Sequence, residues 1–502
     1  MNAKTLNMTE MNKKLFSSLL LSALVAIPSV GGSLSVKYPC SDAMVLQQNT
    51  SVLIWGHAAP GSVVKLCPSW TRKEYSCTTD ADSVWRARVA TPRASYTNYV
   101  VDIRCGREHL AIRDVLVGEV WVASGQSNME MPLRGFHNCP VEGYLETLCS
   151  AAAPDRIRMF TVGVDSAEEP LSDVRRPSLW RKASVSTLGE MSAVAYFFAR
   201  TLNEALDVPV GILALPRGGT RVEGWLPRST VEDYGTEDCS ATSQMQFDDC
   251  MRAYMMYNAM EQPVCGYTAR GFIWYQGCSN VGAHERFAAR MEDLARQWRS
   301  DWGDTLAAMP FYQVEIAPYE YGDGPDGESG ALLREAQHKC ADSIPNSAIV
   351  CTNDLVYPYE SGNIHPCRKA EVGLRLAALA LHRDYGFAMV PCYSPRADSV
   401  GVDPENPSCL LVHLSDCIGG LDRTKDIRGL EIAGEDGIFH PVHEVEMVWQ
   451  EDIMKVSSPQ VPRPACVRYG WGNFRPGNLH SSDGLPLVPF VQSVGEVPLG
   501  KR

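Results

Sequence analysis

The amino-acid sequence predicts an α/β protein in which a mostly parallel sheet packs between helices, flanked by an N-terminal and a C-terminal β-sandwich-like region. Between residues 118 and 386, apolar strand-like runs alternate with helical patterns, which is typical of a parallel sheet built from βα units. Residues 33–117 and 387–502 instead hold short strand-like runs separated by turn residues, which is typical of antiparallel β-sandwiches. We therefore expect three folded regions.

Length and composition agree with a globular protein of several domains. The chain has 502 residues, of which 45% are hydrophobic and 21% are charged, so it is too long for one ordinary core and too apolar for a disordered chain. The formal net charge is −13, whereas nucleic acids and anionic lipids attract basic surfaces. We expect neither as a partner.

Residues 1–32 have the pattern of a signal peptide. Lys13 and Lys14 precede an apolar run, residues 15–27, and small residues follow. The apolar run is short for a bilayer span, although a retained signal anchor remains an alternative. No later stretch is apolar and long enough to be a transmembrane helix. We expect a protein of the secretory pathway, secreted or lysosomal, with no stable membrane insertion after cleavage.

Cysteine usage fits that compartment. Seventeen cysteines favour disulfides, which persist in an oxidising lumen, and the odd number leaves at least one thiol unpaired or paired with another chain. Their pairing cannot be read from the sequence. No C-x-x-C pair occurs, which disfavours a zinc ribbon. Asn49-Thr50-Ser51 is a glycosylation sequon.

The N-terminal region, residues 33–117, contains strand-like runs at 51–55, 62–66 and 99–103, and turn residues such as 59–61 separate them. It holds no cluster of histidine and acidic residues. We therefore expect a structural or substrate-positioning domain.

The central region, residues 118–386, contains the strongest periodic patterns. Apolar residues recur at steps of three and four in two stretches, which predicts amphipathic helices. A third helix is expected to close the domain, with Pro366 in its favoured first turn. The expected helices span 188–206, 284–302 and 366–384, and the expected strands span 208–215, 311–316 and 347–351.

The C-terminal region, residues 387–502, returns to short strands such as 409–414. We expect a second β-sandwich-like region whose last part, from Tyr469 onward, folds back on the central domain.

The first candidate site residue is Ser127. The apolar run 116–122 predicts a strand, and Gly125-Gln126-Ser127-Asn128-Met129 follows it. In an open α/β sheet, ligands bind at the carboxyl ends of the strands, and a glycine lets a substrate approach the backbone. Ser127 is therefore a candidate nucleophile, although an ordinary Ser-Asn turn would have the same local pattern.

Three further stretches supply complementary groups. Gly218-Gly219-Thr220 and the segment 274–280, which ends in Asn280, each follow an apolar strand, and His365-Pro366 opens a helical pattern. Serine, glycine amides, asparagine and histidine are the groups that acyl transfer needs as nucleophile, oxyanion donors and base.

These stretches resemble the four conserved blocks of the SGNH hydrolases, the GDSL-like esterases, and in detail those of the sialate O-acetylesterase family and its bacterial relatives. The serine block matches residues 125–129, the glycine block 218–225, the asparagine block 274–280, and the histidine block 364–376. Further similarity at 44–47, 333–337, 468–469 and 484–486 extends the resemblance over nearly the whole expected mature chain. It implies the three-layer SGNH fold for residues 118–386.

The resemblance also implies catalytic roles. Ser127 would be the nucleophile and His365 the general base. The oxyanion would be held by the Ser127 N–H, by a glycine N–H, and by the Asn280 side chain. Gly219 is slightly favoured over Gly218 for the glycine donor.

The acid that would orient His365 is not evident. SGNH enzymes usually carry an aspartate three residues before the histidine, where this chain has Gly362, followed by Asn363. Asp354 or Glu360 could take that role, or a main-chain carbonyl could orient the imidazole in a Ser-His dyad. Cys278 is a second departure, because related sequences often have glutamate there; it could alter substrate contacts or form a disulfide.

Sugar-binding candidates lie in the same blocks. Amides, a carboxylate and aromatic faces suit sugar hydroxyls and ring faces, and we expect substrate contacts from Gln126, Glu223, Trp274 and Gln276. Core packing is the alternative for the tryptophans, Trp225 and Trp274.

We therefore expect a serine esterase that removes O-acetyl groups from sialic acids of glycoconjugates and releases acetate. One alternative keeps the chemistry but takes acetylated xylan or another carbohydrate as substrate. Another is an inactive glycan-binding protein on the same scaffold, which the missing aspartate would favour. No cofactor and no metal are expected, because an oxyanion hole and a base suffice for acetyl esters and the sequence shows no metal-ligand cluster.

Overall fold

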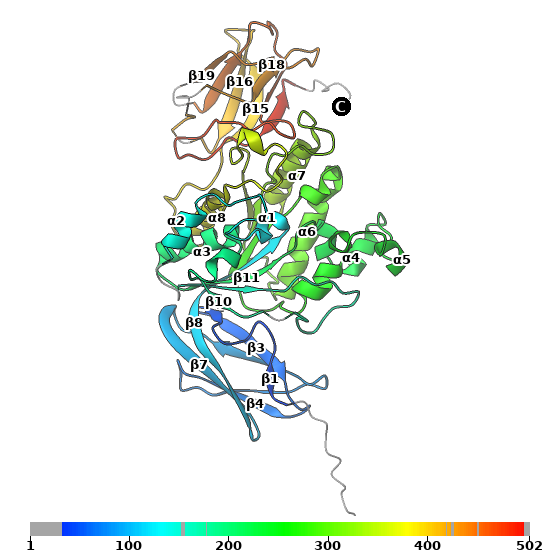
Figure 1. Ribbon diagram of the computed structural model, residues 1–502. Helices are drawn as coiled ribbons and strands as arrows, with labels where there is room; N and C mark the ends of the chain where they lie inside the picture. The colour runs from blue at the N-terminus through cyan, green and yellow to red at the C-terminus, as the bar shows by residue number, and fades with distance from the viewer. Residues whose placement is uncertain are drawn as a thin grey trace, which may run out of the picture.

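The computed structural model describes residues 33–151, 156–176, 178–417, 419–422, 426–448 and 451–495. The predicted signal peptide, residues 1–32, lies outside the described residues. Figure 1 shows three parts stacked in chain order: a β-rich N-terminal part, a central part with helices around a sheet, and a β-rich C-terminal part. The predicted α/β class is confirmed.

The N-terminal part contains one sheet of its own and shares a second with the central part. The first has the order β1-β3-β6, formed by Ser35–Val36, Ser51–His57 and Val84–Ala90. Strands β2 (Val45–Gln47), β4 (Val63–Pro68), β5 (Tyr75–Thr78) and β7 (Ser95–Cys105) belong to the second. Along β6, arginines at 86 and 88 are exposed while Trp85, Ala87 and Val89 are buried, as expected of a strand with one face on a core.

Strand β8 (Glu108–Gly125) connects the N-terminal and central parts. Its first portion pairs with β7 in antiparallel register, from Cys105↔Glu108 to Ser95↔Val117. Its last portion, from Glu119 to Gly125, pairs in parallel with β11. The boundary predicted between residues 117 and 118 therefore falls inside one continuous strand, because the apolar run that predicts a strand there does not reveal that its partners change along its length.

The central sheet has the order β10-β9-β11-β8-β12-β13-β14. All neighbouring pairs from β9 to β14 are parallel, and β10 joins the β9 edge in antiparallel register. All residues of β11 are buried, as expected of a strand covered by helices on both faces. The strands besides β8 are β9 (Ile157–Thr161), β10 (Arg181–Lys182), β11 (Val210–Pro216), β12 (Gly271–Tyr275), β13 (Phe311–Val314) and β14 (Ser347–Val350).

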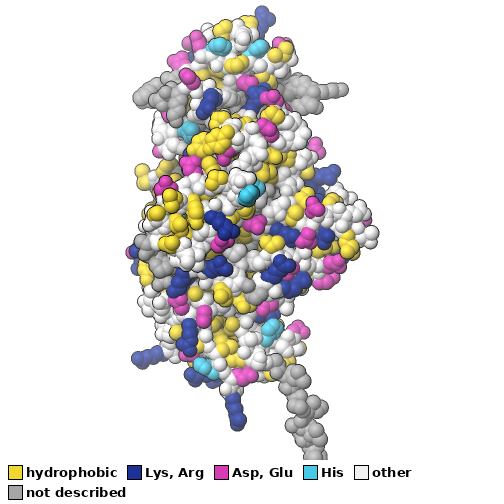
Figure 2. Space-filling model, viewed as in Figure 1, with side chains coloured by type: hydrophobic (Ala, Val, Ile, Leu, Met, Phe, Trp, Pro, Cys, Tyr) yellow, Lys and Arg dark blue, Asp and Glu magenta, His cyan; other side chains and the backbone are white. Residues whose placement is uncertain are grey.

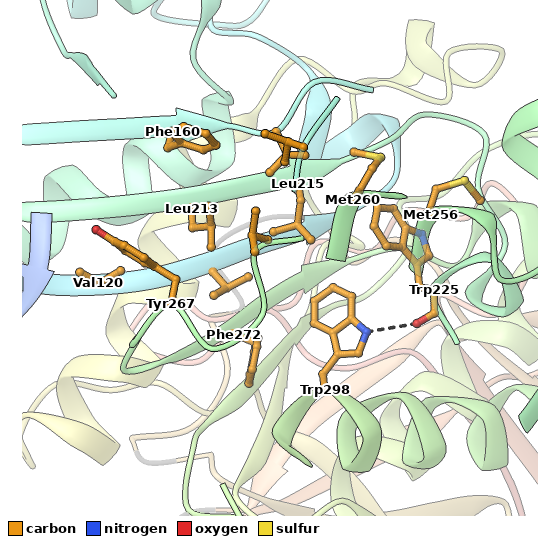
Figure 3. Packing of buried hydrophobic residues seen from close by; sticks show 14 of the residues in the cluster. Val120, Phe160, Leu213, Leu215, Trp225, Met256, Met260, Tyr267, Phe272 and Trp298 are labelled. Carbon is orange, nitrogen blue, oxygen red and sulfur yellow. Dashed lines mark hydrogen bonds between the residues drawn. The ribbon is translucent and has the colours of Figure 1, made fainter. Parts of the chain in front are cut away.

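Helices lie on two sides of this sheet (Figure 1). Helices α3 (Ala193–Leu206) and α8 (Lys369–Asp384) share one hydrophobic cluster with alternate sheet residues such as Ile212 and Ile273. Helices α6 (His284–Asp301) and α7 (Ser329–Ser343) pack in another cluster with the intervening sheet residues. Figure 3 shows part of this second cluster, where Trp298 Nε1 donates a hydrogen bond of 3.1 Å to the Trp225 carbonyl.

The predicted helices are confirmed, with shifts at their ends. The expected helix at 188–206 is a 3₁₀ turn, Leu188–Glu190, followed by α3, whose N-terminus is capped by the Ser192 hydroxyl accepting from Ala195 N. Pro366 lies three residues before the start of α8. The shorter helices are α1 (Ser127–Glu130), α2 (Tyr144–Cys149), α4 (Arg228–Asp233) and α5 (Ala241–Gln244), with 3₁₀ turns at Val222–Trp225, Asp249–Met251, Cys278–Asn280 and Pro358–Glu360 and a π-turn at Tyr257–Glu261.

The C-terminal part consists of two four-stranded antiparallel sheets that share one hydrophobic cluster. Leu410 and Met454 enter this cluster from one sheet, and Ile432 and Val467 from the other. The first sheet has the order β15 (Arg396–Val402), β16 (Cys409–Ser415), β20 (Ile453–Ser457), β19 (Glu444–Val448), and the second β18 (His440–Pro441), β17 (Leu430–Ala433), β21 (Cys466–Tyr469), β22 (Phe490–Ser493).

The segment after Tyr469 folds back on the central part, as predicted. Asn473 is fully buried there. Its side-chain oxygen accepts from Gly330 N at 2.7 Å, and its carbonyl accepts from Tyr319 N at 3.0 Å. His480 reaches the central carboxylate Asp354 at 3.1 Å. These bonds hold the C-terminal part against the helices beside the sheet.

The expectation of disulfides is corrected by the structure, in which cysteines from each part of the chain, such as Cys77, Cys278 and Cys417, are free thiols. Cys77 and Cys105 illustrate the geometric reason. Both pair with Val64, from strands on opposite sides of β4, so their Cα atoms are about two strand spacings apart, roughly 9–10 Å. A disulfide spans at most about 7 Å between Cα atoms. Other thiols form hydrogen bonds, as Cys340 does with Gln313 at 3.4 Å.

Acidic and basic side chains are interspersed over the face shown in Figure 2. Within the part of the chain that the structure describes, no helix is both long and apolar enough to cross a membrane.

Candidate active site

Ser127 lies at the carboxyl edge of the central sheet, directly after β8. Gly125 ends the strand with φ of 132°, and a Cβ there would lie 2.2 Å from the Tyr275 carbonyl oxygen, so only glycine fits. The chain then turns, and Ser127 is the first residue of α1. Ser127 is half-buried, whereas its neighbours Gln126 and Asn128 are buried. The turn thus presents the serine at the surface of the sheet edge.

His365 meets Ser127 from a distant part of the chain. Its Nε2 lies 2.8 Å from Ser127 Oγ, across 238 residues of sequence. The Phe136 ring packs edge-on against the imidazole, with 5.1 Å between the ring centres. Burial, and secondarily the charge of Lys369, lowers the pKa of His365 to about 4. The imidazole is therefore neutral at neutral pH and can accept the serine proton at Nε2.

A pair of buried side chains holds the two backbone carbonyls that flank His365. Asn128 Nδ2 donates to the Ile364 carbonyl at 3.0 Å, and Lys369 Nζ donates to the Pro366 carbonyl at 2.7 Å. Lys369 Nζ also donates to Asn128 Oδ1 at 2.7 Å. The residue after the nucleophile is thus connected to both sides of the histidine.

Asn363 fixes the His365 backbone from a third direction. Its Oδ1 accepts from His365 N and its Nδ2 donates to the His365 carbonyl, both at 3.0 Å. Asparagine side chains commonly stabilise turns by bonding the backbone two residues on. Asn363 therefore acts on the main chain of His365.

Neither candidate acid contacts the imidazole. Asp354 pairs with Arg375 and His480, and Glu360 accepts the backbone N–H groups of Tyr357 and Cys367. Among the described residues, no carboxylate is hydrogen-bonded to the His365 ring.

The two glycines of the 218–219 turn differ in their hydrogen bonds. The Gly218 N–H donates to the Glu130 carboxylate. The Gly219 N–H donates to no protein group among the described residues, while the Gly219 carbonyl accepts from Ser279 Oγ at 3.0 Å. Gly219 has φ of 78°, which favours glycine. The Ser127 N–H is also unbonded within its helix, because the first N–H groups of an α-helix lack an internal acceptor.

Asn280 follows Ser279, whose hydroxyl bonds the 218–219 turn, and its side chain is buried at 3% exposure. Its Oδ1 accepts from Val222 N at 3.0 Å and from Gln276 Nε2 at 2.7 Å. Its Nδ2 donates to Glu223 at 3.0 Å, which leaves one of the two amide hydrogens for another acceptor.

The residues expected to contact sugar are Gln126, Glu223, Trp274 and Gln276, and their side chains are buried. All four are at most 2% exposed. Gln126 Oε1 accepts two backbone N–H groups, at Gly277 and Cys278, and Glu223 is paired with Arg290. Trp274 packs among other aromatic rings. Most of their polar atoms bond protein groups, but Trp274 Nε1 and Gln276 Oε1 have no hydrogen-bond partner among the described residues.

Two residues near the nucleophile were missed by sequence analysis. Glu130, one turn after Ser127, receives the Gly218 N–H, and burial raises the pKa of this carboxyl against the opposing effect of that bond. Lys369 was recognised only as part of the histidine block. Its place in that block was a signal, but a sequence block does not reveal that its ammonium is buried.

Cys278 forms no disulfide, and its thiol contacts the Tyr321 hydroxyl at 3.5 Å. Within the described residues, no group of three or more histidine, cysteine and acidic side chains is suited to hold a metal ion.

Comparison with known proteins places this site in a family. The model of the carbohydrate esterase family named sialic acid-specific acetylesterase matches residues 117–382, which include Ser127, Gly219, Asn280 and His365. The expected resemblance is thus confirmed.

Known proteins that are similar over most of this chain support the same family. The chain is 28% identical to sialate O-acetylesterase of Pongo abelii over 512 residues, covering 93% of each chain. It is 28% identical to that of Mus musculus over 513 residues, covering 90% of this chain and 93% of the relative. The crystal structure of XAC1771, a carbohydrate acetylesterase from Xanthomonas citri, superposes with a TM-score of 0.80 at 29% identity, covering 92% of this chain and 100% of that one. The chain therefore belongs to the sialic acid-specific acetylesterase family of carbohydrate esterases and is a carboxylic ester hydrolase.

Proposed function

We propose that this enzyme is a serine esterase that removes O-acetyl groups from sialic acids of glycoconjugates, through an acetyl-enzyme on Ser127 with His365 as base. The observation that carries the proposal is the 2.8 Å contact between Ser127 Oγ and His365 Nε2 at the carboxyl edge of the sheet. A neutral imidazole in hydrogen-bonding contact with a serine hydroxyl is the arrangement that activates a serine nucleophile.

The proposed reaction has two halves. Ser127 Oγ attacks the acetyl carbonyl carbon while His365 Nε2 takes the hydroxyl proton. The imidazolium then gives this proton to the sugar oxygen as the ester bond breaks, which leaves the acetyl group on Ser127. Water then attacks the acetyl-enzyme while His365 takes its proton, and the imidazolium returns that proton to Ser127 Oγ as the bond between Oγ and the acetyl carbon breaks and acetate leaves.

The negative oxygen of each tetrahedral intermediate would be held by the N–H groups of Ser127 and Gly219 and by the Asn280 amide. Two observations support this choice. The Gly218 N–H is already bonded to Glu130, whereas the Gly219 N–H has no protein acceptor among the described residues. Asn280 has an amide hydrogen to spare after bonding Glu223. One such donor typically contributes about 10²–10³ in rate.

We also propose that a Ser-His dyad operates. The bonds that Asp354 and Glu360 make elsewhere support it, as does the glycine at position 362, where related enzymes carry the acid.

The substrate proposal rests on the family and on the sialate O-acetylesterases among the relatives. Acetylated xylan or another acetylated carbohydrate is the alternative, which the carbohydrate acetylesterase XAC1771 favours. An inactive glycan-binding protein is disfavoured, because the Ser127–His365 contact is intact.

Two further expectations remain proposals. Entry into the secretory pathway, with secretion or lysosomal delivery, rests on the sequence of residues 1–32. A three-layer hydrolase domain between two β-sandwich-like regions is supported by the parallel register of the central sheet and by the hydrophobic clusters on its two sides.

The experiment is an acetate-release assay with three substrates: a generic acetyl ester, O-acetylated sialic acid and acetylated xylan. We expect hydrolysis of the generic ester, preference for the sialic acid, and activity near background in folded Ser127→Ala. Preference for xylan would change the substrate class. Substantial turnover by Ser127→Ala would refute the mechanism, and the absence of turnover of all three substrates by the parent would refute the proposed function.

A further inference from the structure

We propose that Lys369 is a positioning residue for the reaction: its ammonium group fixes the His365 loop against the Ser127 helix and places a positive charge next to that loop, so that the Ser-His pair works without an orienting carboxylate. The inference rests on the proposed function, because it assigns a role within that mechanism.

The first support is the hydrogen-bond geometry. Lys369 Nζ lies 2.7 Å from both Asn128 Oδ1 and the Pro366 carbonyl oxygen. Asn128 in turn holds the Ile364 carbonyl at 3.0 Å. The backbone on both sides of His365 is therefore tied to the residue that follows the nucleophile. Loss of these bonds would free the imidazole to move relative to Ser127 Oγ.

The second support is the position of the charge, which is unfavourable for the fold alone. Lys369 is 1% exposed, and burying an ammonium group costs free energy. It is also the first residue of α8, where the helix dipole disfavours a cation. Among the described residues, no carboxylate forms an ion pair with it. A hydrophobic residue would suit this position better if only stability mattered.

The groups that face Lys369 come from several elements. The titratable groups are Glu360, His365 and Cys367 around the start of α8, Cys278 after β12, and Cys139 after α1. The centre of the Tyr275 ring lies 6.0 Å from Lys369 Nζ. Burial lowers the pKa of Lys369 to about 7, and Glu360 opposes this effect. At acidic pH, where His365 titrates, Lys369 is therefore charged.

The charge has a direct consequence for His365. After burial, Lys369 is the other cause that lowers the pKa of His365. A carboxylate in a catalytic triad stabilises the imidazolium, whereas a neighbouring ammonium destabilises it. His365 is therefore a weaker base than the histidine of a triad, but it stays unprotonated at acidic pH. The position of its imidazole is fixed by the hydrogen bonds that Asn128 and Lys369 make to the backbone on either side of it.

The test uses the full chain with Lys369→Met, Asn128→Ala and the double variant. Lys339→Met is the matched control, since Lys339 is an exposed lysine on α7 that pairs with Glu335 at 3.1 Å. The first readout is an NMR titration of histidine-labelled protein, with the His365 signal assigned by its loss in His365→Gln. The second is kcat and KM on a generic acetyl ester as a function of pH. Thermal unfolding verifies that each variant is folded.

In Lys369→Met we expect the His365 titration midpoint to rise by about 0.5 pH unit or more. The acid limb of kcat/KM should move with it, and kcat should fall about 10- to 100-fold while KM changes less than about threefold. Asn128→Ala should lower kcat but leave the midpoint low, because the charge remains. The double variant should be no slower than the slower single variant, because the two residues share one bond. Lys339→Met should match the parent.

An unchanged His365 midpoint in folded Lys369→Met would overturn the proposal, and so would parental kcat in that variant. If Lys369→Met does not fold, parental kcat in Asn128→Ala would overturn it instead. The NMR titration needs no turnover, so it separates the outcomes: a parent without esterase activity refutes the proposed function, while the coupling between Lys369 and His365 is still measured.

Discussion

Arg375 donates two hydrogen bonds to Asp354, from Nη1 to Oδ1 at 2.8 Å and from Nη2 to Oδ2 at 2.7 Å. His480 of the C-terminal part contacts the same carboxylate at 3.1 Å. Arg375 and Asp354 are both buried or nearly so. This pairing joins α8, the loop after β14 and the C-terminal part, and it gives Asp354 a structural role at a position where an orienting acid was a candidate.

Asp354→Asn should therefore cost stability and spare catalysis. Breaking a buried ion pair typically costs about 3–5 kcal/mol, because it leaves a buried charge unpaired. We expect a loss of that order in urea unfolding, with kcat of the folded protein within about tenfold of the parent. His365→Ala is the control, and its kcat should be near background. An Asp354→Asn loss in kcat as deep as that of His365→Ala would identify Asp354 as the missing acid.

The stability contribution of Asp354 should depend on pH. Burial alone would raise the pKa of Asp354, but the hydrogen bonds from Arg375 and His480 outweigh it and hold the pKa well below its usual range. The carboxylate therefore stabilises the fold above the unfolded pKa, about 3.9, and the stabilisation is lost as pH falls below that value. The difference in unfolding free energy between parent and Asp354→Asn should be full at pH 6 and shrink between pH 4 and pH 2.5. A constant difference would contradict this.

Glu360→Gln should have a mild effect. Glu360 accepts from Tyr357 N at 2.8 Å and from Cys367 N at 2.9 Å, and glutamine retains one of the two acceptor oxygens. We expect a kcat within about tenfold of the parent and a small loss of thermal stability. Activity as low as that of His365→Ala would instead name Glu360 as the orienting acid.

The pH profile should reflect the low pKa of His365. Burial and the Lys369 charge lower that pKa to about 4, and the base is active only when unprotonated. We expect kcat/KM to stay level from neutral pH down to about pH 5 and then to fall with a midpoint near pH 4. A midpoint between pH 6 and pH 7, where an ordinary histidine titrates, would show that the environment does not shift this residue.

Gly218→Ala should slow the reaction. A Cβ at position 218 would lie 3.1 Å from the Glu130 carboxylate and 3.3 Å from Ser127 Cβ, so Ser127 or Glu130 must move by a few tenths of an ångström. Since small displacements of a nucleophile are costly, we expect kcat to fall about tenfold or more with little change in thermal stability. Gly362→Ala is the matched control, because its Cβ would meet open space. Equal activity of the two variants would argue against a tight fit around Ser127.

Sequence by itself determined the local elements and the chemical groups of the site. The helix α6 carries apolar residues at steps of three and four, and its observed span, His284–Asp301, differs from the prediction by one residue at its end. Ser127, Gly219, Asn280 and His365 were placed at strand ends and turns because such positions are marked by apolar runs and glycines. These features depend on neighbouring residues, which a pattern records.

Only the tertiary structure decided which groups meet and which face the solvent. The contact of His365 with Ser127 spans 238 residues, and the pairing of Asp354 with His480 joins two parts of the molecule. Sequence pattern gave Gln126 and Trp274 as candidate sugar contacts, and only the structure shows that both side chains are buried. The sequence pattern did not indicate that the Lys369 side chain is buried. Burial and partner choice depend on packing between distant segments, and that packing sets the pKa of His365 and the positions of its neighbours.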